Sequence, residues 1–155
     1  MAVKSFQGAR AKKTGTKTPQ LLVRDIMCQN LILFHPEQSI HEVMQKFVKY
    51  SISGGPVVNN AGKLVGVISE ADCMKEISDS RYFNMPILDK SVQNFMTDGV
   101  DTIDASKSLF EAASLFSNST RRRYPVMEKG RLVGQLSRKD VVLAALNLKS
   151  NTWRS

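Results

Sequence analysis

The sequence of 155 residues predicts an α/β protein made of two tandem copies of one unit, each with the order strand, helix, strand, strand, helix. Two alignments within the chain lead to this fold class. Residues 23–47 align with residues 92–116 at an offset of 69 positions, and Val, Met, Ser, Glu and Phe recur in register. GKLVGVISEAD at 62–72 aligns with GRLVGQLSRKD at 130–140, and a Pro-Val pair precedes both segments. Such a repeat indicates a duplicated structural unit.

The first half of each unit predicts a strand followed by a helix. The strand-like stretches are LILF at 31–34 and VDTI at 100–103. A Ser followed three residues later by Glu, at Ser39 and again at Ser108, forms a capping box that marks a helix start. Apolar residues then recur at helical spacing along one face. These positions are Ile40, Val43, Met44, Phe47 and Val48 in the first copy and Leu109, Ala112, Ala113 and Phe116 in the second.

The second half of each unit predicts a hairpin and a closing helix. Pro-Val-Val, a turn at 59–62 and an apolar stretch at 63–68 indicate strand, turn and strand, and residues 125–136 repeat the pattern. Ser69-x-x-Asp72 and Ser137-x-x-Asp140 are capping signatures for the closing helix. One unit is too small to be stable alone. We therefore expect the two units to pack about a pseudo-twofold axis, so that any cleft near the axis occurs twice.

The predicted boundaries divide the chain into five segments: a basic tail at 1–20, a first repeat at 21–80, a linker at 81–91, a second repeat at 92–148 and a C-terminal extension at 149–155. The stretch from 78 to 90 is apolar enough that we expect it to pack against the body. The net charge is +8, and the tail contributes five Lys and Arg residues and no acid. This composition predicts a disordered extension, or an arm that binds nucleic acid or another acidic partner.

Several classes of protein are excluded by missing signals. No apolar run approaches the ~18 residues of a membrane span, and no apolar region follows the basic N-terminus as in a secretory signal, so we predict a cytoplasmic protein. Cys28 and Cys73 are far apart in the sequence and are expected to be buried, reduced thiols rather than metal ligands. No HExxH, nucleophile elbow or phosphate-binding loop is present, which predicts no metal site and no enzyme activity.

The repeated pattern, a Pro-Val strand followed by Gly-x-Leu-Val-Gly-x-x-Ser-x-x-Asp, resembles the cystathionine-β-synthase (CBS) domain, and two copies resemble a Bateman module. The resemblance covers residues 22–148. The segments ISGGPVV and GVISEADCMKEI are also similar to small stand-alone Bateman proteins of bacteria. The resemblance implies a regulatory module that needs no cofactor, binds AMP, ADP, ATP or S-adenosylmethionine, forms a homodimer and signals to a separate partner protein.

The resemblance also implies which residues bind the ligand. The Asp of Ser-x-x-Asp accepts hydrogen bonds from both ribose hydroxyls, while the Ser and the helix N-terminus face phosphate. One cleft would use Val67, Ser69 and Asp72 with Gly55, Pro56 and Val57, and the other Gln135, Ser137 and Asp140 with Tyr124, Pro125 and Val126. Capping alone would also account for the Ser and the Asp. Tyr124 stands where the family has a small residue, and it could stack on adenine or fill the pocket.

The two copies differ in charge. Three arginines at 121–123 replace Ile-Ser-Gly at 52–54, and Arg-Lys at 138–139 replaces Glu-Ala at 70–71. We expect Arg122, Arg123 and Lys139 to meet ligand phosphates. The cleft with Asp140 should then bind a charged nucleotide more tightly than the cleft with Asp72. The alternatives are a solvated turn, or arginines that reach the cleft of the opposite repeat across the axis.

These observations predict a non-enzymatic sensor of an adenosine-containing ligand. One alternative is a nucleic-acid or anionic-partner adaptor that uses the basic tail, with the repeats as scaffold. The other is a structural interaction module whose clefts bind nothing.

Overall fold

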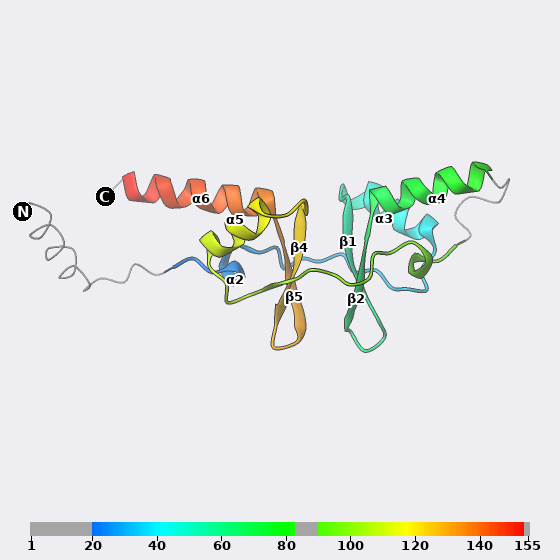
Figure 1. Ribbon diagram of the computed structural model, residues 1–155, viewed down its shortest axis with the longest axis horizontal. Helices are drawn as coiled ribbons and strands as arrows, with labels where there is room; N and C mark the ends of the chain where they lie inside the picture. Colours follow the sequence, from blue (N-terminus) through cyan, green and yellow to red (C-terminus); the bar gives the residue numbers. More distant parts are fainter. Residues whose placement is uncertain (1–19, 83–89, 154–155) are drawn as a thin grey trace, which may run out of the picture.

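Two β-hairpins stand side by side at the centre of the molecule, and the helices lie to their outer sides (Figure 1). The computed structural model describes residues 20–82 and 90–153. The predicted basic tail, the linker at 83–89 and the last two residues lie outside the described residues. No helix in the described ranges has the length and apolar character needed to cross a membrane.

The helices and strands follow the predicted order, except that the first strand of the first repeat is reduced to a single bridge, and each repeat is preceded by a single helical turn. The first repeat consists of α3 (Ile40–Tyr50), β1 (Gly54–Val58), β2 (Leu64–Ser69) and α4 (Glu70–Tyr82), preceded by α2 (Val23–Ile26). The second consists of β3 (Ile103–Asp104), α5 (Leu109–Ser117), β4 (Arg123–Glu128), β5 (Arg131–Ser137) and α6 (Arg138–Trp153), preceded by the 3-10 helix η1 (Val92–Asn94).

The predicted caps are present at the start of α3 and α5. The Oγ of Ser39 accepts a hydrogen bond from the amide of Glu42 at 3.2 Å, and the Oγ of Ser108 accepts one from Glu111 at 3.1 Å. The predicted apolar faces are buried in part, because Val48 and Ala113 are exposed whereas Ile40, Val43 and Phe47 are not. The capping boxes therefore set both helix starts, as predicted.

The first strand of each unit is much shorter than its apolar stretch. In the first repeat only Phe34 pairs, as a parallel bridge to Val57, and in the second only β3 pairs with β4. The two hairpins are antiparallel pairs, with Gly54 opposite Ser69 and Arg123 opposite Ser137, and each contains one register shift, after Val57 and after Val126. The sheets are thus built mainly from β1–β2 and β4–β5.

The segments that precede the two repeats are exchanged. Val23 is buried in the core of the second repeat and Val92 in the core of the first. The backbone of Cys28 forms two hydrogen bonds with Gln135 on β5, at 2.9 and 3.0 Å. In the same way Thr97 forms two, both 2.9 Å, with Val67 on β2. Each leading segment therefore passes along the sheet of one repeat before it enters the other (Figure 1).

The second glycine of each Gly-x-Leu-Val-Gly motif makes this exchange possible. A Cβ on Gly66 would lie 2.9 Å from the carbonyl oxygen of Thr97, and one on Gly134 would lie 2.9 Å from that of Cys28. Because a backbone oxygen has little freedom to move, only glycine lets the leading segment run this close to the hairpin.

The prediction of two buried thiols is half wrong. Cys73 lies in the first core, and burial raises the pKa of its thiol to about 11, with Asp72 and Glu70 acting in the same direction. Cys28 is exposed, because it lies on the exchanged segment rather than in a core. For the stretch from 78 to 90, α4 continues to Tyr82, and the expected contacts of residues 83–89 lie outside the described residues.

Candidate ligand-binding site

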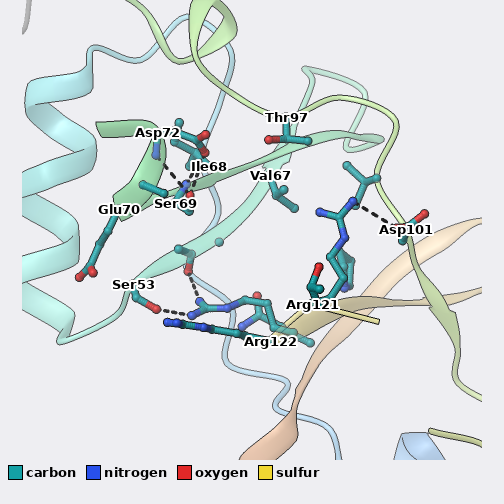
Figure 2. A pocket seen from close by; sticks show the side chains of 18 of the residues that line it. Ser53, Val67, Ile68, Ser69, Glu70, Asp72, Thr97, Asp101, Arg121 and Arg122 are labelled. Carbon is teal, nitrogen blue, oxygen red and sulfur yellow. Dashed lines mark hydrogen bonds and ion pairs between the residues drawn. The ribbon is translucent and has the colours of Figure 1, made fainter. Parts of the chain in front are cut away.

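A cavity of about 630 Å³ lies where the two hairpins meet, beside the N-terminus of α4 (Figure 2). Both repeats contribute to its walls. The first repeat and the segment after η1 supply Ser53, Gly54, Gly55, Val67, Ile68, Ser69, Glu70, Ala71, Asp72, Met74, Thr97, Val100 and Asp101, and the second repeat supplies Thr120, Arg121, Arg122, Arg123, Pro125 and Gln135. The cavity has the volume of a typical small-molecule site.

Asp72 is held at one wall by the capping box of α4. Its Oδ2 accepts hydrogen bonds from the amide of Ser69 at 2.8 Å and from its Oγ at 3.0 Å, and the amide of Asp72 donates to that Oγ at 3.4 Å. Among the described residues no donor reaches Oδ1 of Asp72. The cap and a ligand contact are therefore compatible, because they use different oxygens of one carboxylate.

The first amides of α4 are partly engaged already. The amide of Glu70 donates to the carbonyl oxygen of Ser53 at 2.9 Å, and the amide of Asp72 donates to Ser69. Of the first three amides, only that of Ala71 has no acceptor among the described residues. The helix N-terminus is thus a weaker anion site than the resemblance implies, and anion binding in this cavity depends on side chains.

Arg123 ties the second repeat to the first. Its Nη1 donates to the carbonyl oxygen of Gly54 at 3.0 Å, and its Nη2 donates to the Oγ of Ser53. Both acceptors are neutral, and no carboxylate lies within ion-pair distance of Arg123 in the described part of the chain. Burial lowers the pKa of this guanidinium and the neighbouring Arg122 lowers it further, against the opposing effect of Glu70. The wall near Ser53 therefore carries a positive charge that has no direct ion-pair partner among the described residues.

The other two arginines lie opposite Ser69 and Asp72 (Figure 2). Arg121 forms an ion pair with Asp101, with 3.2 Å between Nη2 and Oδ2. The exposed side chain of Arg122 forms no hydrogen bond or ion pair with any described residue. The cavity thus has a carboxylate with a vacant oxygen on one side and a guanidinium with vacant donors on the other.

The structure gathers about half of the predicted site residues around this cavity. Those that line it are Gly55, Val67, Ser69, Asp72, Arg122, Arg123, Pro125 and Gln135. The predicted residues that do not line it are Pro56, Val57, Tyr124, Val126, Ser137, Lys139 and Asp140. Val57 lies in the first core and Val126 in the second, and Pro56 between Gly55 and Val57 is fully buried as well.

Tyr124 fills the second core. Its side chain is 2% exposed, its ring packs on Phe116 with centroids 4.9 Å apart, and its hydroxyl donates to the Oγ of Ser119 at 2.7 Å. Tyr124 therefore belongs to the core and does not line the cavity, so that it can neither stack on a ligand there nor occupy the space. Asp140 forms the same capping box as Asp72, with Oδ2 2.9 Å from the amide of Ser137.

The arginines lie in the cleft that the sequence did not favour. Arg121 to Arg123 line the cavity of Asp72 rather than a cleft of Asp140, because β4 faces β1 across the pseudo-twofold axis. Arg138 is engaged elsewhere, since its side chain donates to the carbonyl oxygens of Arg121 and Ser119 at 2.9 and 3.2 Å. The geometry therefore does not support the expectation that the arginines favour binding of a charged nucleotide near Asp140.

Among the wall residues that sequence reasoning missed, three come from an unexpected part of the chain. Thr97, Val100 and Asp101 lie on the segment that leads into the second repeat, yet they line the cleft of the first. The alignment of the repeats shows that these positions are equivalent to Cys28 and its neighbours, but it does not show that the segments are exchanged. The only signal was the glycine at Gly66, which leaves room for a neighbouring backbone.

Comparison with known proteins agrees with this architecture. The CBS domain family matches residues 23–79 and 92–147. The crystal structure of CBSX2 in complex with AMP is 32% identical with a TM-score of 0.73, covering 83% of this chain and 98% of that chain. The CBS domain pair of protein MJ0100, in complex with 5′-methylthioadenosine and S-adenosyl-L-methionine, is 28% identical with a TM-score of 0.68, over 83% and 98% of the two chains.

Relatives differ in how much of their own length the chain spans. Protein MJ1426 of Methanocaldococcus jannaschii is 28% identical over an alignment of 155 positions, which covers 81% of this chain and 92% of that protein. The chain spans only 41% of MJ1225 and 25% of L-aspartate semialdehyde sulfurtransferase from the same organism. Since the family matches most of the described residues in two copies, the chain belongs to the CBS domain family and consists of two tandem CBS domains packed as a Bateman module.

Proposed function

We propose that this chain is a non-enzymatic regulatory module that binds an adenosine-containing ligand in the cavity of Asp72. The observation that carries the proposal is the pairing, across one cavity, of the vacant Oδ1 of Asp72 with the vacant guanidinium of Arg122. A carboxylate oxygen is a strong acceptor for the hydroxyls of a ribose, and a guanidinium is matched to a phosphate. An adenine nucleotide presents both groups at its sugar end.

The remaining walls suit a flat heterocycle. Val67, Val100 and Pro125 supply apolar surface to the cavity wall, and the neighbouring Gly54 and Gly55 add backbone without side chains. Pockets of this kind bury most of a ligand against apolar groups and use a few polar groups for orientation. We place the base among these residues, with Gln135 available for a hydrogen bond.

Of the adenosyl ligands implied by the family, AMP or another nucleotide fits the charges better than S-adenosylmethionine. The sulfonium and ammonium groups of S-adenosylmethionine would lie near the arginines, and like charges in a partly desolvated cavity repel. Support for an adenosyl ligand comes from the relatives, because CBSX2 was crystallised with AMP and MJ0100 with S-adenosyl-L-methionine and 5′-methylthioadenosine.

We further propose that the module acts as a homodimer on a separate protein. Exposed apolar side chains on the outer helices support an interface, with Val48 on α3 at 82% exposure and Phe110 on α5 at 68%. Val142, Leu143 and Leu146 give α6 an exposed apolar face as well. Apolar surface of this kind on a soluble protein marks interaction sites. Sedimentation equilibrium at several protein concentrations tests the dimer, and a monomer throughout would exclude it.

Ligand binding is tested by thermal unfolding of the full chain with AMP, ADP, ATP, adenosine and S-adenosylmethionine. A ligand at ~100 times its Kd stabilises the native state by ~2.7 kcal/mol, which for a chain of this size raises Tm by about 5 to 10 °C. We expect the nucleotides to raise Tm more than adenosine at equal concentration. No change with any of the five at millimolar concentration would contradict the proposal.

A further inference from the structure

The ion pair between Arg121 and Asp101 separates the ligand cavity from a shallower hollow beside it. Both residues line the cavity, and both also line the hollow, together with Ser117, Asn118, Ser119 and Thr120. Figure 2 shows the two side chains meeting at the side of the cavity away from Glu70. A ligand phosphate bound by the arginines would therefore lie close to this pair.

The fold itself does not require an ion pair at this place. The positions equivalent to Asp101 and Arg121 in the other half of the molecule are Ile32 and Ile52, at the offset of 69 residues. Both isoleucines are partly buried and pack against the first core. The charged pair is thus confined to the cleft that contains the open cavity.

The ion pair between Arg121 and Asp101 is also easily broken, so that Arg121 can change its partner. The side chains of Arg121 and Asp101 are 42% and 64% exposed, and ion pairs with this exposure contribute little net stability. The backbone of Arg121 is fixed, since its amide donates to the Oγ of Ser119 at 3.3 Å and its carbonyl oxygen accepts from Nε of Arg138 at 2.9 Å. Only the side chain of Arg121 has to move to change partners.

Asp101 differs from the other two acids of the cavity in what it contacts. Asp72 is committed to the cap of α4, and Glu70 forms no ion pair with a described residue. Asp101 alone neutralises one of the arginines directly, at the distance a ligand phosphate would take. From these observations we infer that Asp101 competes with the anionic group of the ligand for Arg121: the guanidinium exchanges the carboxylate of Asp101 for a phosphate when a nucleotide binds.

This inference rests on the proposed function and makes Asp101 a residue that sets affinity without binding the ligand. The competition lowers the affinity for ligands that carry a phosphate and leaves that for a neutral nucleoside unchanged. The module would then respond at a higher nucleotide concentration than the three arginines alone would give.

The test is a double-mutant cycle on the full chain, with AMP and adenosine titrated by calorimetry. Asp101→Asn should raise the affinity for AMP about 2- to 5-fold, the range of an exposed ion pair, and should leave that for adenosine unchanged. Arg121→Gln should lower the affinity for AMP, and Asp101→Asn should have a smaller effect in that background. Asp101→Ser provides a second variant in case the first is poorly folded.

Glu128→Gln is the matched control, because it removes an exposed ion pair of 2.9 Å with Arg24 that lies outside the cavity. It should leave both affinities unchanged. The inference is wrong if Asp101→Asn fails to raise the affinity for AMP, raises that for adenosine equally, or keeps its full effect with Arg121→Gln. If the unmodified protein binds neither compound, the proposed function fails, and the inference fails with it. That outcome differs from one in which AMP binds but the effects of Asp101→Asn and Arg121→Gln on its affinity are independent.

Discussion

The two repeats of this molecule share a capping box at the closing helix and differ in what surrounds it. Next to Asp72 the hairpin carries Gly54 and Gly55, whereas the equivalent positions near Asp140 carry Arg123 and Tyr124. Tyr124 fills the second core and Arg123 reaches across to the first repeat, so the second repeat supplies charge to its neighbour's cleft. The difference teaches that duplicated halves can diverge, so that one half borders the open cavity and the other supplies its cations.

The largest effect that would test this comparison is on the affinity for the sugar. Asp72→Asn should weaken adenosine binding by ~1.5 to 3 kcal/mol, because it removes a charge-assisted hydrogen bond to the ribose, which corresponds to about 10- to 150-fold in Kd. Adenosine is the better probe, since loss of the carboxylate also reduces repulsion of a phosphate. Titration calorimetry measures the Kd for adenosine of the variant and of the unmodified protein.

Asp140→Asn is the paired variant, because Asp140 forms the same cap and does not line the cavity. It should change the adenosine affinity little. The comparison fails if Asp140→Asn proves the more damaging of the two while both variants retain the Tm of the unmodified protein.

The second effect tests the exchange of the leading segments. Val23 and Val92 are equivalent in the repeat and both are fully buried, but each lies in the core of the other half. Replacement of either by Ala should destabilise the protein by about 2 kcal/mol through lost burial and a residual cavity. Hydrogen exchange should show the faster amides in β4 and β5 for Val23→Ala and in β1 and β2 for Val92→Ala. Loss of protection in the variant's own repeat would contradict the exchange.

The repeat fold could be predicted because its signals are local. The capping boxes at Ser39 and Ser108 each join residues three positions apart, and the glycine turns of the hairpins are equally local. Such features can be recognised directly in the sequence. The exchange depends instead on which half each leading segment docks against, and both halves offer similar apolar surfaces. Periodicity has no way to distinguish a contact within a repeat from one between repeats.

The lining of the cavity could be predicted in part for the same reason. Ser69, Asp72 and Val67 belong to one short motif, and the fold keeps them together around the cavity. Asp101 comes from the exchanged segment, and the arginines act across the pseudo-twofold axis. Their contribution depends on the packing of the two repeats, which no spacing in the sequence encodes.

A third, smaller effect compares the two helix starts. Ser39→Ala and Ser108→Ala each remove a cap and should cost ~1 kcal/mol of stability. Because Ser108 is the more buried of the two, its variant also leaves the amide of Glu111 with less access to water, and the cost should be the larger. Urea unfolding monitored by circular dichroism gives both values. If Ser108→Ala lost no more stability than Ser39→Ala, burial of the capping serine would not determine how much each cap stabilises its helix.

The smallest effect tests the role of Tyr124 in the second half. Tyr124→Phe keeps the ring packed on Phe116 and removes only the hydroxyl that donates to Ser119. Loss of one hydrogen bond between neutral groups should lower the free energy of unfolding by about 0.5 to 1.5 kcal/mol, an effect reduced further because Ser119 is only partly buried. Since Tyr124 does not line the cavity, the affinity for AMP should be unchanged. A weaker affinity at unchanged stability would mean that the hydroxyl reaches the ligand, and that the second half contributes more than charge to the site.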